Sequence, residues 1–328
     1  MTEVSIMAAC MDETLLQKSH AYCRDLTRKQ AGNFYYGLKL LPEPKRSAMY
    51  ALYAYMRLID DIADASDERN SAHRLADLDA WRLQTHAVLG DGVDDAERRA
   101  ALRRHILWPG FADLITRYQI PLAVLDDMIA GQRQDLEPVT LATFQELYQY
   151  CYRVASVVGL ASICVFGYQR RGSGGGDNDG GQAAEELAIA RGIAFQLTNI
   201  LRDLREDGAR HEGGGEGVGG GGRCYLPLDE MARFDVTPAT LAAGEPGPGF
   251  DALMEFQIAR AEAYYTQSAT LENHIQEDSR PTLRAMTAIY HGILQKIKAD
   301  PHRVLRERVR LSLWSKLNIG WKSLRERG

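Results

Sequence analysis

The sequence lacks the marks of several common protein classes. Its cysteines number five, and none of them forms a CxxC pair or a Cys/His spacing typical of metal ligands. We therefore expect neither a disulfide framework nor a zinc site, and we interpret the cysteines as reduced thiols of a cytoplasmic protein. No GxxxxGK[ST] segment is present, and no GxGxxG segment follows a predicted strand, so a nucleotide-binding loop is not indicated.

A basic excess and long apolar runs are also missing. The formal net charge is −5, whereas a nucleic-acid-binding protein normally carries a basic excess over its footprint. We therefore expect no nucleic-acid partner. Residues 1–17 do not combine a basic start with a long apolar core, so no signal peptide is predicted. The longest nearly apolar stretch, 154–167, is too short to span a bilayer and predicts a buried helix, so we expect no transmembrane segment.

Strand signals are scarce, and helical periodicity dominates the chain. Prolines fall between the periodic segments or at their edges, where helices begin or end. This pattern predicts an all-α bundle, and the absence of a dividing linker predicts one domain over residues 1–328. The predicted helical segments are 13–29, 45–65, 71–90, 95–118, 121–134, 141–168, 182–207, 250–276 and 279–298.

Two glycine-rich segments, 172–181 and 208–222, interrupt this pattern. They have almost no apolar side chains, so they cannot contribute to a core, and we expect flexible surface loops. A phosphate cradle is the alternative, but neither segment carries a phosphate-loop pattern. The second segment follows directly on an acidic motif, so its position matters for function.

The first motif with chemical content is RLIDDIAD, residues 57–64. On a helix Asp60 and Asp64 lie one turn apart on one face, with Arg57 a turn earlier. Two carboxylates at this spacing repel each other, and Mg²⁺ resolves the conflict because it bridges carboxylates to substrate phosphates. The alternative is a solvated acidic helix end, extended by Asp67 and Glu68. Taken alone, the motif does not decide between the two.

The second motif is a polar stripe along an otherwise apolar helix. Gln196, Asn199, Asp203 and Asp207 are spaced three, four and four residues apart, so they share one face. Amide and carboxylate oxygens within an apolar helix are costly to bury unless something binds them. Two facing helices that each offer carboxylates one turn apart would form a cage for Mg²⁺ ions that hold a diphosphate.

A third acidic group is formed by Asp126, Asp127 and Asp135. It lacks the amide stripe, a nearby arginine and strongly apolar flanks. We therefore interpret it as a solvated helix face and not as part of a site.

Four segments together resemble the squalene/phytoene synthase family. They are NFYYGLKLLP at 33–42, RLIDDIAD at 57–64, YCYRVA at 150–155 and NILRD at 199–203. Their order and separations also fit, and the similarity runs from about residue 15 to 325. The resemblance implies the class I isoprenoid synthase type of helical bundle, with a central prenyl pocket, and an enzyme that joins two prenyl diphosphates head to head.

The resemblance also implies roles for individual residues. The magnesium ligands would be Asp60, Asp64, Asn199, Asp203 and Asp207, which with Arg57 and Tyr150 form the catalytic group. The substrate contacts would be Phe34, Arg57, Val154, Ala155, Gln196, Asn199, Arg223, Tyr225, Tyr290 and Arg308. For Phe34, Tyr290 and the other tyrosines, the alternative is an ordinary place in the core.

Two features depart from the family pattern, and the second bears on the product. The connection from Asp207 to Arg223 is longer and richer in glycine than the family pattern. Ser156 stands where many relatives have glycine, a feature more like the bacterial presqualene synthases of hopanoid pathways. We therefore expect presqualene diphosphate or squalene from two farnesyl diphosphates, with NADPH needed only if the product is squalene. The alternative is phytoene from two geranylgeranyl diphosphates.

Other functions rank lower. A chain-elongating prenyltransferase usually repeats DDxxD in its second motif, and a terpene cyclase offers an N/D…S/T…E triad; NILRD fits neither. A non-catalytic assembly protein on the same fold would be expected to lose its acids, and this chain keeps them. The sequence does not determine an oligomeric state.

The C-terminal segment, 303–327, interleaves basic residues with apolar ones and with Trp314 and Trp321. This pattern suits a segment that lies at an anionic bilayer surface. The alternative is a final core helix whose arginines point to solvent. We expect a cytoplasmic protein with peripheral contact at the inner membrane surface.

Overall fold

The computed structural model of the chain describes residues 12–63, 71–90, 93–136, 140–168, 179–209, 223–245, 247–312, 319–320, 322–323 and 325. Within these residues the regular structure is helical, and the only β-type pairings are two isolated bridges, Thr140 with Cys224 and Tyr168 with Ile275. The prediction of an all-α fold is confirmed. Asp64 lies outside the described residues, as do Trp314 and Trp321, so the expectations for these residues stay predictions.

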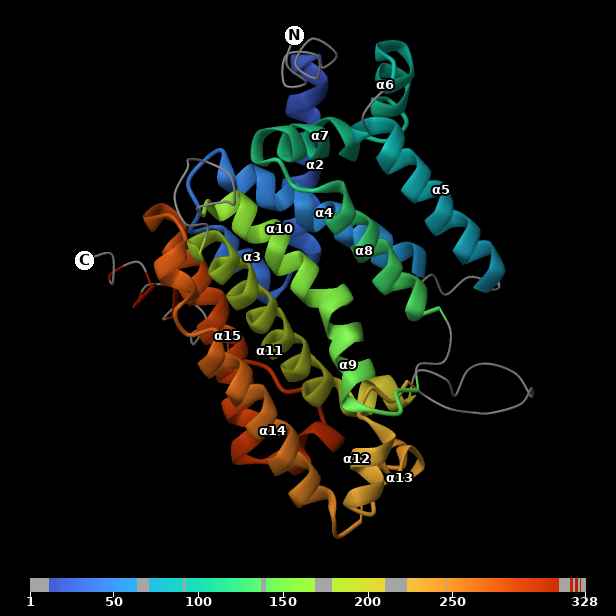
Figure 1. The fold of residues 1–328 in the computed structure, drawn as a ribbon, viewed down its shortest axis with the longest axis vertical. Helices are drawn as coiled ribbons and strands as arrows, with labels where there is room; N and C mark the ends of the chain where they lie inside the picture. Colours follow the sequence, from blue (N-terminus) through green and yellow to red (C-terminus); the bar gives the residue numbers. More distant parts are fainter. Residues whose placement is uncertain are drawn as a thin grey trace.

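The helices form an elongated bundle in which the longest helix, α11, is central (Figure 1). One part of the bundle contains α2 (Glu13–Gln30), α3 (Asn33–Leu38), α4 (Lys45–Ala63), α5 (Ser71–Leu89), α6 (Asp95–Leu102), α7 (Leu107–Tyr118) and α8 (Leu122–Gln134). The middle contains α9 (Phe144–Cys151), η1 (Tyr152–Ser156), α10 (Val157–Phe166) and α11 (Asp179–Ala209). The rest consists of α12 (Leu228–Arg233), α13 (Pro238–Ala242), α14 (Phe250–Gln267), η2 (Leu271–His274), η3 (Glu277–Ser279), α15 (Arg280–Ala299) and η4 (Pro301–Leu305).

Two apolar clusters build the core. One is centred on α4, α7 and α10, where the ring of Tyr55 stacks on that of Phe111 with centroids 4.0 Å apart. The other joins α11, α14 and α15. Phe34, Tyr152 and Phe195 pack against both clusters. Aromatic side chains therefore lie where the two clusters meet. The apolar cavity described below lies at the same place.

The predicted helix over 95–118 is divided into α6 and α7. Pro109 lies in the first turn of α7, where its missing N–H costs no helical hydrogen bond. A continuous helix would instead set the proline ring against the carbonyl of His105. The chain therefore breaks at 103–106, which the periodicity alone did not indicate.

The predicted helix at 141–168 is one run from Phe144 to Phe166, with a π-helical turn, η1, in its middle. By length and composition this run could cross a membrane, but 56% of its most apolar window is buried. Part of it also lines the main cavity. We therefore interpret it as a core helix, as the sequence predicts.

The η1 turn packs directly on α11. A Cβ atom at Gly192 would come within 2.5 Å of the Ser156 Cα, so only glycine allows this approach. The Ser156 hydroxyl donates a hydrogen bond of 2.9 Å to the Ile189 carbonyl across the same contact. Serine at this position therefore ties the two helices together.

The two glycine-rich segments are described only at their edges. Residues 179–181 of the first belong to α11 and not to a loop, and Gly208 and Ala209 are the last residues of the same helix. The rest of both segments lies outside the described residues. Our prediction of flexible loops there stays a prediction.

Candidate active site

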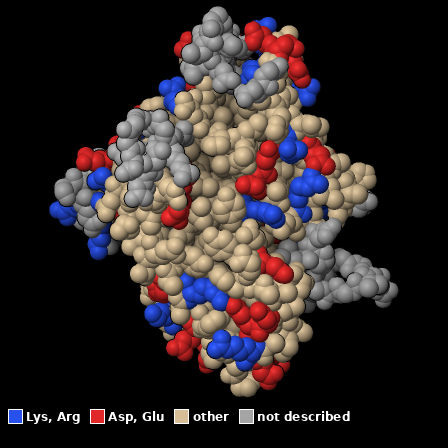
Figure 2. Space-filling model, in the orientation of Figure 1, with Lys and Arg blue, Asp and Glu red and all other residues tan. Residues whose placement is uncertain are grey.

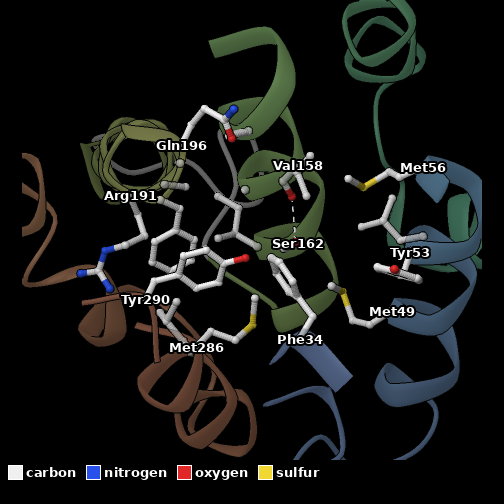
Figure 3. A pocket seen from close by; sticks show the side chains of 18 of the residues that line it. Phe34, Met49, Tyr53, Met56, Val158, Ser162, Arg191, Gln196, Met286 and Tyr290 are labelled. Atoms are coloured by element: carbon white, nitrogen blue, oxygen red, sulfur yellow. Dashed lines mark hydrogen bonds between the residues drawn. The ribbon is translucent and has the colours of Figure 1, made fainter. Parts of the chain in front are cut away.

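A cavity of about 330 Å³ lies between α3, α4, α10, α11 and α15. Figure 3 shows Met49, Tyr53 and Met56 of α4 on one side of it, facing Met286 and Tyr290 of α15. Its apolar lining consists of Ala31, Phe34, Leu38, Met49, Leu52, Met56, Val154, Ala155, Val158, Ile163, Phe166, Ala188, Phe195, Leu271, Leu283 and Met286. Such a lining excludes water and accepts a long apolar chain.

The cavity is long because it follows the helices. One part of its wall runs from Val154, in the turn before α10, to Phe166 at the end of α10. Another part runs along α11 from Ala188 to Asn199. At 1.5 Å per residue, these stretches measure roughly 16–18 Å. One end is apolar and lies near Phe166, and the other is polar and lies near Asn199.

The polar end carries Asp60, Gln196 and Asn199. The Asn199 side-chain amide donates to Gln196 Oε1 over 3.3 Å. Its other atom, Oδ1, is buried and has no hydrogen-bond partner within the described part of the chain. A buried amide oxygen left unpaired is costly, so this atom is suited to a cation or a donor that enters the cavity.

Three aromatic rings form the wall beside this end. The rings of Tyr290 and Phe195 are stacked, with centroids 4.5 Å apart, and Phe34 meets Tyr290 edge to face at 5.4 Å. Burial raises the pKa of Tyr290 to about 12, so its hydroxyl stays protonated at neutral pH. Phe34 and Tyr290 are therefore both core residues and cavity residues, and the two sequence-based interpretations do not exclude each other.

Asp203 lies next to the cavity and is held by two arginines. Arg202 donates to both of its carboxylate oxygens, with its Nε at 2.8 Å from Oδ1. Arg308 approaches the same carboxylate, with Nε 3.0 Å from Oδ1 and Nη2 3.2 Å from Oδ2. Arg308 also pairs with Glu206 at 3.2 Å. Two fixed positive charges thus stand at the second acidic motif.

The first acidic motif is arranged differently. The Arg57 guanidinium donates to Asp61, while Asp60 lines the cavity. The Nε of Arg57 is buried without a hydrogen-bond partner in the described part of the chain. Among the described residues, no group of three or more His, Cys, Asp or Glu side chains is close enough to hold a metal ion. Asp64, the fourth expected carboxylate, is not among them.

Asp135 joins two buried tyrosines near the same end of α11. It accepts hydrogen bonds from the hydroxyl of Tyr150 at 3.2 Å and from that of Tyr225 at 3.1 Å. The two rings are stacked with centroids 4.8 Å apart. Arg223 donates to the Asp135 carbonyl at 2.6 Å, and its backbone N–H donates to the Asp207 carbonyl at 2.8 Å. Burial and the nearby Asp135 raise the pKa of Tyr150 well above its ordinary value.

The interpretation of the third acidic group as a solvated helix face is therefore wrong. Asp135 anchors Tyr150 and Tyr225, and Asp126 is paired with Arg82 at 2.8 Å and with His86 at 2.9 Å. The reason is tertiary: the partners come from other segments, which periodicity along α8 does not show.

The predicted site residues fall into two sets. The cavity brings together Phe34, Asp60, Val154, Ala155, Gln196, Asn199 and Tyr290. Outside its lining lie Arg57, Tyr150, Asp203, Asp207, Arg223, Tyr225 and Arg308, in the arginine and tyrosine groups described above. Tyr53 and Met56 were missed, although a helical spacing of three and four places them with Asp60. Arg202 was missed, although it adjoins Asp203.

Arg191 is a further lining residue that the sequence did not reveal. It is 5% exposed, and its guanidinium donates to Ser268 and to Thr287. Burial lowers its pKa. Figure 3 shows the guanidinium turned away from the cavity, so Arg191 braces α11 against α14 and α15.

The outer surface gives no sign of a large charged platform on the face seen in Figure 2. There, Lys and Arg alternate in small groups with Asp and Glu, and no patch of one sign covers the face.

The profile of the squalene/phytoene synthase family matches residues 27–315. The chain is 34% identical over 304 residues to a 15-cis-phytoene synthase of Synechococcus elongatus, which covers 92% of this chain and 91% of that protein. It is 32% identical over 314 residues to a phytoene synthase of Mycobacterium tuberculosis, covering 95% and 92%.

Solved structures resemble the whole chain. A dehydrosqualene synthase matches with a TM-score of 0.77 and 26% identity, covering 95% of this chain and 97% of the other. A squalene synthase of Alicyclobacillus acidocaldarius matches with a TM-score of 0.69 and 23% identity, covering 90% and 97%. The second likeness speaks for the fold alone.

Proposed function

The chain belongs to the squalene/phytoene synthase family, whose members join two prenyl diphosphates head to head, and from this premise we propose that it makes phytoene from two geranylgeranyl diphosphates. The observation that carries the proposal is the similarity to phytoene synthases at 32–34% identity over nine-tenths of the chain. The sequence alone had ranked farnesyl diphosphate first. The comparisons favour the alternative.

The length of the cavity supports a long substrate. The described wall follows α10 and α11 for roughly 16–18 Å, and before Gln196 and Asn199 it is mainly apolar, with Ser162 and Arg191 as its polar residues. A chain of four isoprene units needs such a run of apolar contacts to leave water.

We propose Mg²⁺ as the cofactor, held by Asp60, Asp64, Asn199, Asp203 and Asp207. The described donors fit this ion, because carboxylate and amide oxygens are the ligands that it takes, and Asn199 Oδ1 is buried without a partner in the described part of the chain. When bound, the ion would neutralise the departing diphosphate.

The protein's own residues supply the remaining chemistry. Arg57, Arg202 and Arg308 place guanidinium groups around the polar end, where they would attract and orient a diphosphate. The faces of Phe34, Phe195 and Tyr290 would stabilise an allylic cation through their electron-rich rings. Apolar side chains would keep out the water that quenches such a cation.

We also propose that the enzyme works in the cytoplasm. The support is that the four cysteines among the described residues, Cys23, Cys151, Cys164 and Cys224, are free thiols.

The experiment is a product assay with purified protein, Mg²⁺ and either geranylgeranyl or farnesyl diphosphate, with and without NADPH. We expect a C40 hydrocarbon identified by mass, no dependence on NADPH, and a kcat/KM at least about 10-fold higher for the longer substrate. Presqualene diphosphate or squalene from farnesyl diphosphate, with no product from geranylgeranyl diphosphate, would overturn the proposal.

A further inference from the structure

A second cavity, of about 440 Å³, lies on the other side of α3 from the first. It is formed by α2, α3, the connection to α4 and the start of α4, and it shares no lining residue with the main cavity. Its walls carry the cationic side chains Arg24, Lys39 and Arg46 and one carboxylate, Glu43.

The carboxylate in this cavity is already engaged. Glu43 Oε1 accepts from Arg46 Nε at 2.9 Å, and Oε2 accepts from the Ser47 backbone N–H at 3.1 Å. Burial raises the pKa of Glu43, but the hydrogen bonds from Ser47 and Arg46 outweigh it and lower the pKa overall. Lys39 has no carboxylate partner in the described part of the chain and lies 5.6 Å from the centre of the Tyr35 ring. The cavity therefore keeps a positive excess.

Two tyrosines add a hydrogen-bonding wall. The Tyr35 and Tyr50 rings are stacked with centroids 6.1 Å apart. Tyr50 is only 5% exposed, and its side chain lines the cavity. The charges that act on this hydroxyl come from Tyr35, Arg46, Glu43 and Arg24, all of which line the cavity. The hydroxyl therefore lies among the charged side chains of the cavity.

The basic character extends beyond the cavity. Arg28 lies one turn after Arg24 on α2, and both are exposed, as is Lys29. The first acid nearby, Asp25, is paired with Arg24 at 3.3 Å. An anion that approaches α2 and α3 therefore meets guanidinium and ammonium groups on several sides.

We propose that this cavity binds the phosphate of an anionic phospholipid headgroup and so docks the face formed by α2, α3 and α4 on a bilayer. Guanidinium groups bind phosphate through paired hydrogen bonds, and the Tyr50 hydroxyl supplies another donor. The ligand chemistry, a phosphate ester among Arg, Lys and Tyr donors, comes from the cavity itself.

The choice of a lipid over a soluble phosphate rests on the proposed function. A product hydrocarbon and its prenyl substrates lose free energy with every methylene that reaches water, so transfer to and from a bilayer is favoured. The short helix α3 lies between the two cavities: Phe34 and Leu38 line the apolar one, and Tyr35 lines the basic one. Binding of a headgroup would therefore place α3 and the apolar cavity near the membrane.

The experiment is flotation of the full chain with phosphatidylcholine vesicles that contain, or lack, phosphatidylglycerol. We expect binding only with the anionic lipid, and weaker binding as salt rises. Lys39→Gln/Arg46→Gln should lower the partition coefficient about 30-fold. Tyr50→Phe keeps all charges and the aromatic ring, and it should lower the partition coefficient roughly 5-fold. A diffuse electrostatic attraction would leave the coefficient of this variant unchanged.

Matched controls separate the cavity from net charge and from catalysis. Arg103→Gln/Lys298→Gln removes the same charge from exposed positions just after α6 and on α15, and this variant should bind as the unaltered protein does. Every variant should retain its activity on detergent-dispersed substrate. A lack of that activity in the unaltered protein would bear on the proposed function and not on docking.

Three results would overturn the proposal. One is no flotation with anionic vesicles at low salt. Another is that the control variant loses as much vesicle binding as Lys39→Gln/Arg46→Gln does. The third is that soluble glycerol phosphate raises the melting temperature, that Tyr50→Phe abolishes this rise, and that the protein does not bind vesicles. This result would identify a soluble ligand.

Discussion

The hydroxyl of Tyr150 lies 3.2 Å from Asp135 Oδ2, and this contact links α9 to the end of α8. The same carboxylate receives the hydroxyl of Tyr225 at 3.1 Å, so one acid sets the positions of two stacked rings. Tyr225 in turn follows Arg223, which is bonded to the end of α11 through the Asp207 carbonyl. The geometry beside the second acidic motif thus depends on a residue from a different helix.

Asp135→Asn should therefore reduce kcat about 10- to 100-fold while the protein keeps its fold. The carboxylate accepts one tyrosine hydroxyl on each of its two oxygens, whereas the amide has only one accepting oxygen. Steady-state kinetics and circular dichroism check this. Asp127→Asn on the same helix serves as the control and should leave kcat unchanged. Equal kinetics for the two variants would show that Asp135 does not position Tyr150.

Asp60→Ala and Asp203→Ala should both lower Mg²⁺-dependent turnover at least about 100-fold, because each removes an expected ligand. Their stabilities should differ. Asp203 is bound by Arg202 and Arg308, and its loss leaves a buried Arg202 without its carboxylate partner. We expect Asp203→Ala to lower the free energy of unfolding by about 1–3 kcal/mol. Chemical denaturation measures this, and turnover that survives in either variant would refute the metal assignment.

Ser162 offers a test of chain-length selection. Within the described part of the chain its hydroxyl donates to the Val158 carbonyl of the same helix, at 2.7 Å. Its side chain lines the cavity between Val158 and Phe166 (Figure 3). Ser162→Phe should fill the apolar end and lower kcat/KM for geranylgeranyl diphosphate about 10-fold more than for farnesyl diphosphate. Ser162→Ala, which adds no bulk, should leave the ratio unchanged. An unchanged ratio in the phenylalanine variant would place the substrate tail elsewhere.

The stability of the protein should fall at high pH. Burial raises the pKa of Tyr50, Tyr53 and Tyr290 to about 12, so the folded protein holds these phenols protonated. Their contribution is fully present below the unfolded pKa of about 10 and is lost as pH rises toward 12. We expect the melting temperature to be flat near pH 8–9 and to drop above pH 10. The melting temperature of the Tyr290→Phe variant should drop less above about pH 10. An equal drop in this variant would assign the effect to other groups.

Much of the fold follows from the sequence because helical periodicity is a local property. The spacing of Asp60 within α4, and of Gln196, Asn199 and Asp203 within α11, is visible in the sequence, since residues three and four apart share a face. The family motifs then indicated that these faces meet. The break before Pro109 and the short helix α3 were missed because each depends on only a few residues.

Tertiary structure decided the partners of the charged groups. Arg308 reaches Asp203 from 105 residues away, and Asp135 holds a tyrosine 90 residues beyond it. No spacing rule connects such residues, because their approach depends on how whole helices pack. The approach of Gly192 to Ser156 shows the same dependence: the sequence places a glycine in α11, but only the packed π-helical turn explains why no larger residue fits.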